Sequence, residues 1–277
     1  MELTSAVCAL IDRVRTQIPI IHCMTNLVTI NDCANAILAV GGSPIMADAP
    51  EESDSITSHA KALVLNIGQL SPRKLDAMLR SGKQASHIGI PIILDPVGVG
   101  ASPFRAHAVR QILECLPISI LRCNRAEAAC IYGLPTAASG IDSNAALSVA
   151  DGEALAFALA NRFSCTVAIT GSIDILADTQ HVYRLAGGHE MLSRVTGMGC
   201  VSSVLCGTYA AVSESPLTAA LAALGMISAA GECAYQSDGQ KGTGSFHIAV
   251  MDALSRFSAQ TLRPYLKITE VSHAKFI

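Results

Sequence analysis

A short glycine-containing run late in the chain carries the clearest chemistry. Residues 195–200 read V-T-G-M-G-C and lead directly into an apolar segment of helical character. Gly197 and Gly199 let the backbone approach a ligand closely, and the first turn of a following helix offers N–H groups that suit an anion such as phosphate. Tight packing of the helix against the turn explains the two glycines equally well. The sequence has neither a P-loop of the G-x-x-x-x-G-K-[ST] type nor a G-x-G-x-x-G run.

Polar residues follow four other apolar runs. Asn66, Asp95, Arg122 and Thr170 each stand at the end of a Val-, Ile- or Leu-rich run, and Asn124 comes two residues after Arg122. Open α/β sheets bind their ligands outside the carboxyl ends of the strands. Ordinary turns use many of the same residue types. Four such ends, with a carboxylate, a guanidinium and an amide among them, favour a ligand site over turns alone.

The segments that must position these residues alternate between strand and helix. Apolar runs of strand length cover 62–65, 90–94, 118–121 and 166–169. Between them, helices are predicted at 71–87, 103–116, 125–132 and 152–161. Strands that are apolar on both faces are typical of a parallel sheet covered by helices on each side. The last third changes to Ala-rich helices, predicted at 199–212, 216–234 and 245–263.

Composition excludes several classes of protein. The 277 residues include 19 basic and 22 acidic side chains, a net charge of −3, which argues against a nucleic-acid-binding surface. Hydrophobic residues make up 51% and charged residues 15%, so the chain can bury a large core and is too apolar to be disordered. Residues 195–231 contain one charge, but their small residues and the break at 213–216 favour two buried helices over a membrane span.

The cysteines and histidines point to a reduced protein without a transition-metal site. None of the ten cysteines has C-x-x-C spacing, and the first residues form no secretory signal. We therefore expect free thiols and a cytoplasmic protein. The eight histidines show neither H-x-x-x-H nor H-E-x-x-H spacing.

Several motifs together resemble one family. The run DPVGVGA at 95–101, the N-x-x-E pattern at 124–127 and the glycine turn at 196–200 are similar to signatures of the vitamin-kinase branch of the ribokinase-like superfamily. The runs IHCMTN at 21–26, GSPIMA at 42–47, LNIG at 65–68 and KGTGSF at 241–246 narrow the resemblance to the hydroxyethylthiazole kinase family. It extends from about residue 19 to residue 262, in order.

The resemblance implies a fold and a reaction. The fold is a three-layer α/β/α ribokinase-like domain over residues 1–270, with a mainly parallel sheet and no lid domain. Residues 271–277 have no counterpart in the family, and we expect a disordered tail there. The reaction is phosphoryl transfer from ATP to the hydroxyl of 4-methyl-5-(2-hydroxyethyl)thiazole, in thiamin synthesis and salvage. Such enzymes commonly form homotrimers with active sites between subunits, and neither nucleic acid nor membrane is an expected partner.

Site residues follow from the same resemblance. Asp95 and Glu127 are the expected Mg²⁺ ligands, directly or through water, because Mg²⁺ keeps several waters and needs few carboxylates. Without the motif, a turn-capping Asp and a helix first-turn Glu are the simpler interpretations. Nucleotide binding is expected at the residues Arg122, Thr170 and Asn124, and thiazole binding at Asn26, Met46 and Gly197. A surface ion pair, a turn residue and a core methionine are the alternatives for Arg122, Thr170 and Met46.

Cys200 occupies the position where most ribokinase-like enzymes place a catalytic Asp. A helix N-terminus lowers the pKa of a thiol, so a thiolate could take the proton of the attacking hydroxyl, with Gly197 and Gly199 shaping the anion-binding turn. Phosphoryl transfer through a loose transition state has a modest need for a base. We therefore predict that Cys200 assists the reaction without carrying it.

Two positions depart from the family pattern, and three other functions stay open. Cys123 stands where relatives have Gly, and Met198 stands where they have Ala or Thr; the Met198 side chain either narrows the phosphate site or points outward. The rival functions are an ATP-dependent dehydratase of hydrated nicotinamide cofactors, a kinase for another vitamin alcohol, and a ligand-binding protein on a kinase scaffold. Cys200 and Met46 argue against the first, and Asn26 and Met46 argue against the second. The third is disfavoured by the retained residues Asp95, Asn124, Glu127, Gly197 and Gly199.

Overall fold

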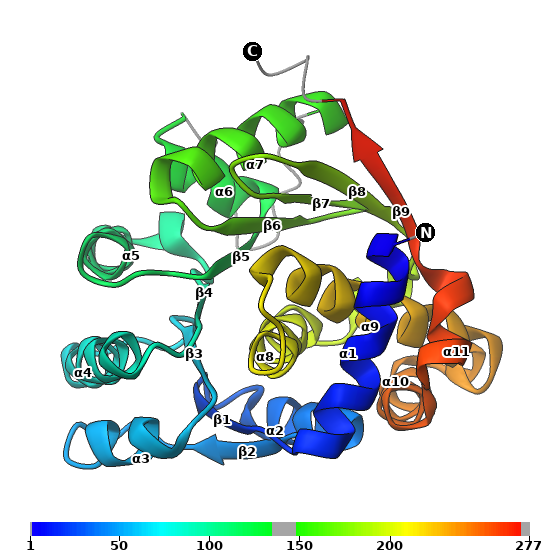
Figure 1. The fold of residues 1–277 in the computed structure, drawn as a ribbon, viewed down its shortest axis with the longest axis horizontal. Helices are drawn as coiled ribbons and strands as arrows, with labels where there is room; N and C mark the ends of the chain where they lie inside the picture. Colours follow the sequence, from blue (N-terminus) through cyan, green and yellow to red (C-terminus); the bar gives the residue numbers. More distant parts are fainter. Residues whose placement is uncertain (1, 135–147, 273–277) are drawn as a thin grey trace.

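A nine-stranded sheet runs through the part of the chain that the structure describes (Figure 1). The structure is a computed structural model that describes residues 2–134 and 148–272. The strand order is β2-β1-β3-β4-β5-β6-β7-β8-β9; the first six strands of this order are mutually parallel, and the last three pair antiparallel. The strands are β1 (Ile20–Met24), β2 (Ser43–Met46), β3 (Ala62–Asn66), β4 (Ile92–Asp95), β5 (Ile120–Asn124), β6 (Thr166–Thr170), β7 (Ile173–Ala177), β8 (Val182–Ala186) and β9 (Lys267–Val271).

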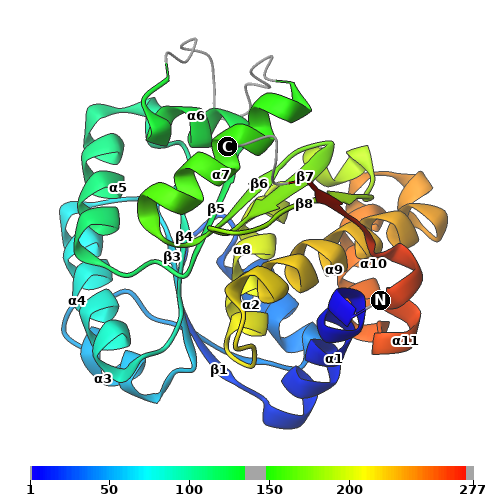
Figure 2. The ribbon, with the colours of Figure 1, turned by 45° about the horizontal axis from the view of Figure 1, so that its top comes forward.

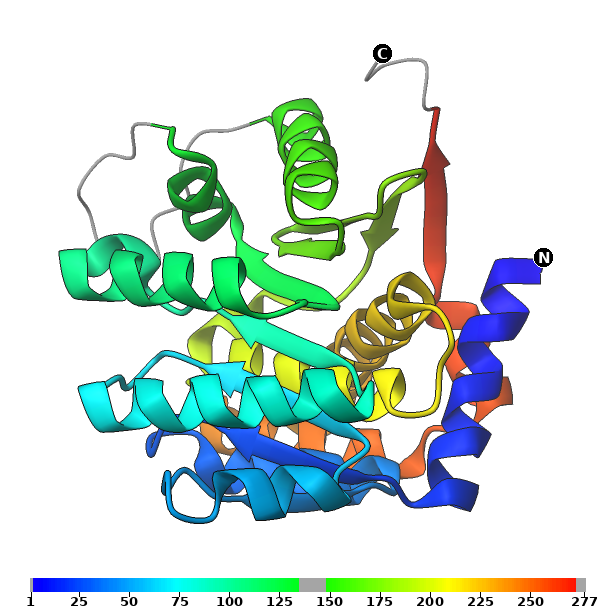
Figure 3. The ribbon, with the colours of Figure 1, turned by 60° about the vertical axis from the view of Figure 1, so that its left-hand side comes forward.

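Helices cover both faces of this sheet, which gives the three predicted layers. Figure 3 shows α3, α4 and α5 side by side on one face, and Figure 2 shows α1, α9, α10 and α11 gathered on the other. The helices are α1 (Glu2–Gln17), α2 (Ile30–Val40), α3 (Ser53–His59), α4 (Pro72–Ile88), α5 (Pro103–Cys115), α6 (Arg125–Tyr132), α7 (Val149–Phe163), α8 (Met198–Ala210), α9 (Pro216–Gln236), α10 (Thr243–Arg256) and α11 (Ala259–Leu262). In the described ranges no strand lies outside the one sheet, so a lid sheet is absent there.

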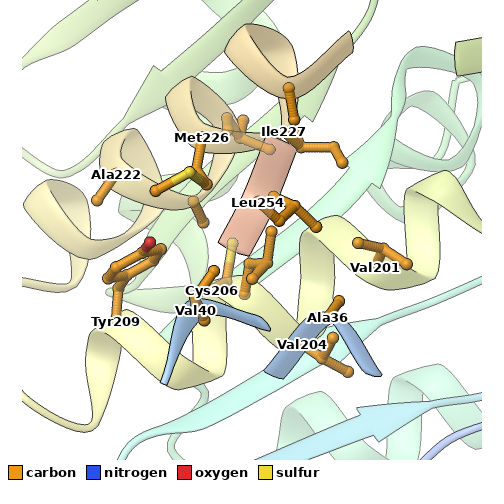
Figure 4. Close-up of a cluster of buried hydrophobic side chains, with 14 of the residues drawn as sticks. Ala36, Val40, Val201, Val204, Cys206, Tyr209, Ala222, Met226, Ile227 and Leu254 are labelled. Carbon is orange, nitrogen blue, oxygen red and sulfur yellow. The ribbon is translucent and has the colours of Figure 1, made fainter. Parts of the chain in front are cut away.

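Each face of the sheet has its own hydrophobic core. On one side α4, α5 and α7 bury aliphatic residues against the sheet. On the other side α2, α8, α9 and α10 meet in a cluster that includes Val40, Val204, Met226 and Leu254 (Figure 4). The parallel strands are apolar on both faces because both faces are covered: every residue of β3 is buried. The two cores together hold the carboxyl edge of the sheet in place, where the polar strand ends lie.

The helix α9 is long and apolar enough to cross a membrane by length and composition alone. In the fold, however, 83% of its most apolar 18-residue window is buried, and it packs between α8 and α10. Its lack of an amphipathic pattern comes from contacts on all sides, as in the core helix of a globular domain. The prediction of two buried helices over 195–231 is confirmed by α8 and α9.

The C-terminal region differs from prediction in two places. The helix predicted at 245–263 is interrupted, because Phe257 adopts an extended conformation that buries its ring, and Ser258 then caps the short helix α11. The tail was expected to begin at Val271, but Val271 is buried at the end of β9 and pairs with Val182. An apolar residue on an edge strand gains from such burial. Residues 273–277 of the predicted tail lie outside the described residues.

Candidate active site

The predicted polar strand ends meet at the carboxyl edge of the sheet. In the parallel register Asn66 lies beside Asp95, and Asn124 lies beside Thr170. Asn26 follows β1 by two residues and is buried, as is Asp95. The expectation from the sequence that these ends come together is therefore confirmed, and their hydrogen bonds define how.

Asp95 forms the buried centre of the cluster. Its Oδ2 accepts hydrogen bonds from Asn66 Nδ2 at 2.7 Å and from Ser203 Oγ at 2.8 Å. Its Oδ1 has no hydrogen-bond partner in the described structure and lies 3.8 Å from Arg122 Nη1. Burial raises the pKa of Asp95, while the Arg122 guanidinium acts in the opposite direction. One carboxylate oxygen is thus left available for a cation or a donor group.

Arg122 lies between Asp95 and the glycine turn rather than in a surface ion pair. Its Nη2 donates to Thr170 Oγ1 at 2.8 Å, and its side chain is 11% exposed. A Cβ added to Gly199 would lie 2.9 Å from Arg122 Nη1, closer than real Cβ contacts come. A side chain at position 199 would therefore displace the Arg122 guanidinium from its present position. A buried cation with a forked donor array fits phosphate oxygens.

Gly197 begins α8 with a left-handed backbone, φ +93°, where glycine is strongly preferred. A Cβ there would also lie 2.7 Å from Thr29 Cγ2. The first intrahelical bond runs from Val201 N to Gly197 O at 2.8 Å. The N–H groups of the preceding first turn therefore have no carbonyl partner within the helix. This turn meets the requirements for holding an anion.

Cys200 lies in this first turn and is buried. Its Sγ accepts hydrogen bonds from Asn26 Nδ2 at 3.3 Å and from Asn66 Nδ2 at 3.2 Å. Burial raises the pKa of the Cys200 thiol, and the Asp95 carboxylate raises it further. Desolvation and the nearby negative charge therefore act against the pKa-lowering effect of the helix N-terminus and favour the neutral thiol over a thiolate.

Glu127 has the role of a helix-capping residue. It forms a capping box with Asn124: Glu127 N donates to Asn124 Oδ1 at 2.9 Å, and Asn124 N donates to Glu127 Oε2 at 2.8 Å. Its Oε1 accepts from Gly98 N at 2.9 Å. Burial and the Asp95 charge raise the pKa of Glu127. Both carboxylate oxygens already serve the backbone, so a metal contact through water suits Glu127 better than a direct one.

The structure places Met46, Met198 and Cys123, for which the sequence left more than one interpretation or outcome open. Met46 is half-buried at the end of β2, next to the hydrophobic core, and pairs in register with Cys23. Met198 is 6% exposed and packs in the same core, so its side chain points inward. Cys123 is fully buried in the opposite core. Both departures from the family pattern are therefore absorbed by packing.

Sequence reasoning placed Asn66 among the polar strand ends without giving it a role, and it missed Ser203 as a member of the site. Asn66 binds Asp95 and Cys200 through one amide nitrogen, and its Oδ1 accepts from Asn26 Nδ2 at 3.3 Å. Its place at a strand end, in the same kind of position as Asp95, was an available signal. Ser203 stands one helical turn after Gly199, but almost all of α8 is buried. No polar face therefore marked which side of α8 points to the sheet.

The donor set fits Mg²⁺ better than a transition metal. No group of three or more His, Cys, Asp or Glu side chains that could hold a metal ion occurs in residues 2–134 and 148–272. Mg²⁺ needs one or two carboxylates and keeps its waters. The unpartnered Asp95 Oδ1 meets that requirement.

Comparison with known proteins identifies the family and agrees with the fold. The profile of the hydroxyethylthiazole kinase family matches residues 11–260. The hydroxyethylthiazole kinase of Ruminiclostridium cellulolyticum is 43% identical over 98% of this chain and 99% of its own length. The hydroxyethylthiazole kinase of Alkaliphilus oremlandii is 40% identical over 98% of this chain and 100% of its own.

Solved structures give the same result. The hydroxyethylthiazole kinase structure from Pyrococcus horikoshii superposes with a TM-score of 0.86 at 36% identity, covering 96% of this chain and 99% of that one. A Staphylococcus aureus pyridoxal kinase in complex with pyridoxal reaches 0.59 at 17% identity, over 77% and 87%, and shares the fold. The sheet and its carboxyl-edge site define a ribokinase-like kinase. Within that class, the chain belongs to the hydroxyethylthiazole kinase family.

Proposed function

We propose that this protein transfers the terminal phosphoryl group of ATP to the hydroxyl of 4-methyl-5-(2-hydroxyethyl)thiazole, a step of thiamin biosynthesis and salvage. The observation that carries the proposal is the meeting of Asp95, Arg122 and Cys200 at the N-terminus of α8. A carboxylate, a guanidinium and a helix N-terminus are what in-line phosphoryl transfer needs for positioning and charge neutralisation. Family membership supplies the identity of the acceptor.

The substrates would lie at opposite ends of this edge. Arg122, with Thr170 and Asn124 beyond it, provides the nucleotide end, since its guanidinium is fixed by Thr170 Oγ1. Asn26 and Met46, at the ends of neighbouring strands β1 and β2, provide the thiazole end together with Gly197. The polarisable thioether of Met46 suits an aromatic sulfur heterocycle. The α8 turn lies between them, where the transferred group would pass.

In the reaction, the substrate hydroxyl oxygen forms a bond to the terminal phosphorus, the bond to the bridging oxygen breaks, and ADP leaves. Asp95 and Glu127 would hold Mg²⁺, which neutralises phosphate charge when bound. Arg122 and the first-turn N–H groups of α8 would orient the phosphoryl oxygens. As a neutral thiol, Cys200 would accept a hydrogen bond from the hydroxyl at Sγ and so help to orient it, and the hydroxyl proton would pass to a phosphoryl oxygen or to water.

The assembly would be a homotrimer with its active sites at subunit interfaces. Leu27 and Val28 are 69% and 70% exposed, and they lie between Asn26 and Thr29, the residue whose methyl group faces Gly197. Large apolar side chains exposed beside a binding site are typical of an interaction surface. A second copy of this chain is the occupant we propose. All ten cysteines are free, in keeping with a cytoplasmic protein.

The test is an ADP-release assay with ATP, with and without hydroxyethylthiazole, at several Mg²⁺ concentrations. We expect ADP release that depends on both thiazole and Mg²⁺. A folded, ATP-binding protein whose ADP release does not respond to thiazole would contradict the proposal. Pyridoxal and a hydrated nicotinamide cofactor, added in parallel, test the other vitamin-kinase and dehydratase alternatives, and thiazole binding without ATP turnover would indicate a binding protein.

A further inference from the structure

The buried ammonium of Lys74 contacts the segments that follow both β1 and β2. Lys74 of α4 reaches across the edge of the sheet, where its Nζ donates to Thr25 O and lies 3.4 Å from Asp48 Oδ2. The Lys74 side chain is 9% exposed, whereas that of Asp48 is 57% exposed. Thr25 directly precedes Asn26, and Asp48 follows Met46 by two residues. The two partners of this ammonium therefore belong to the two segments that carry the proposed thiazole contacts.

A buried histidine makes a second contact between the same two segments. The Nε2 of His22 in β1 lies 2.9 Å from Ala47 O, directly after Met46. Because a carbonyl oxygen only accepts, the proton is on Nε2, and Nδ1 must accept the hydroxyl of Thr57 in α3 at 2.9 Å. Burial lowers the pKa of His22, which keeps this neutral form. Both ring nitrogens are thus used, and one of them holds the residue next to Met46.

Stability alone does not explain this arrangement. Removing an ammonium from water costs several kcal/mol in a protein interior, and an apolar residue of similar volume is often at least as stabilising as a buried ion pair. A buried charge with directional partners instead fixes their relative position. The pairing between β1 and β2 ends at Cys23 and Met46, and Lys74 holds the residues that follow this last pair. Beyond that pair, the Lys74 and His22 contacts define the spacing of the two segments.

We propose that Lys74 and His22 are positioning residues that set the affinity for the thiazole ring by holding Met46 and Asn26 at a fixed separation. This inference rests on the proposed role of Asn26 and Met46 in thiazole binding. Neither residue touches the reacting atoms. Their loss therefore weakens thiazole binding and leaves ATP binding and the chemical step largely intact.

The test compares Lys74→Met with Lys83→Met, which removes an exposed lysine from the same helix. We expect Lys74→Met to raise the KM for hydroxyethylthiazole at least tenfold, with the KM for ATP within twofold and kcat within threefold of the control. A raised thiazole KM with an unchanged kcat means that the substitution weakens binding of the thiazole equally in the ground state and in the transition state. A thiazole KM within twofold of the Lys83→Met value, or an equal rise in both KM values, would overturn the proposal.

Two milder variants keep the test decisive if Lys74→Met does not fold. Asp48→Asn removes the charge of the exposed partner of Lys74. Thr57→Val removes the hydroxyl that donates a hydrogen bond to His22 Nδ1. Each should raise the thiazole KM about threefold without changing the ATP KM. Thiazole KM values unchanged in both folded variants would refute the positioning role.

Hydrogen–deuterium exchange of the substrate-free protein separates this inference from the proposed function. We expect amides of residues 46–49 to exchange at least tenfold faster in Lys74→Met, or in Asp48→Asn, than in Lys83→Met. If the wild type shows no thiazole-dependent turnover, the proposed function fails, yet the exchange rates still decide whether Lys74 fixes this segment. Exchange rates equal to those of Lys83→Met would contradict the claim that Lys74 holds residues 46–49 in place.

Discussion

At the scale of single residues, Cys200 tests how much the reaction depends on a base. Its thiol is buried, its pKa is raised, and its sulfur accepts two amide hydrogen bonds. General bases typically contribute 10²- to 10⁴-fold. We expect Cys200→Ala to lower kcat by less than about a hundredfold, because a loose transition state needs little proton removal. Steady-state kinetics measures this directly.

The matched control for that variant is Cys206→Ala, which removes another buried thiol from α8. It should leave kcat within about twofold of the wild type. If Cys200→Ala abolished turnover while both substrates still bound normally, Cys200 would have to carry the proton transfer, contrary to our account.

Asp174 provides a pH-dependent test beside the nucleotide end. It accepts from Gly171 N at 2.9 Å, directly after Thr170, and burial raises its pKa from 3.8 to about 6. A carboxyl with a raised folded-state pKa contributes stability that is fully present below pH 3.8 and lost as the pH rises through 6. A pKa change of this size corresponds to about 3 kcal/mol.

Urea unfolding of wild type and Asp174→Asn at pH 5 and pH 7 measures this contribution. The amide keeps an oxygen for Gly171 N but does not titrate. We expect the wild type to lose free energy of unfolding relative to the variant between these pH values, by about 1–2 kcal/mol, since part of the titration occurs below pH 5. A difference independent of pH would show that Asp174 is not buried as described.

At the scale of elements, α5 holds the loops after β3 and β4. Arg105 Nη1 donates to Ile67 O and Val97 O, each at 2.7 Å, and Nη2 donates to Gly68 O at 2.8 Å. Hydrogen bonds from charged donors contribute about 1.5–3 kcal/mol each. Arg105→Met should therefore lower the free energy of unfolding by at least about 2 kcal/mol, measured by urea denaturation. Arg110→Met, exposed on the same helix, should change it by less than about 0.5 kcal/mol.

The central strands β3 to β6 and the helices that follow them could be predicted from the sequence, because their local signals agree with their packing. The outer strands β1, β2, β7, β8 and β9 were not predicted. Ser71 caps α4 and Pro72 stands in its first turn, two residue types that favour a helix start, and α6 spans the predicted 125–132. The break at Phe257 could not be predicted, because it depends on the core pocket that buries the ring. Cys200 shows the same limit at the site: its position follows from the glycine turn, but its pKa depends on Asp95 and burial.

At the scale of the whole molecule, the exposed Leu27 and Val28 predict self-association. Light scattering of the purified protein should give a mass three times that of the 28.8 kDa chain. Leu27→Asp should shift the mass downward and reduce thiazole turnover, because the apolar pair borders the substrate end. A monomeric wild type with full thiazole-dependent turnover would contradict the interfacial site.

The measurement that tests the central claim most directly is a competition between acceptors. The protein is incubated with Mg-ATP and equal amounts of hydroxyethylthiazole and pyridoxal, and all products are identified by mass. Our account predicts phosphorylated thiazole in a one-to-one ratio with ADP, and unmodified pyridoxal. ADP without phosphorylated thiazole, or phosphorylated pyridoxal in its place, would show that the site at the carboxyl edge serves another reaction.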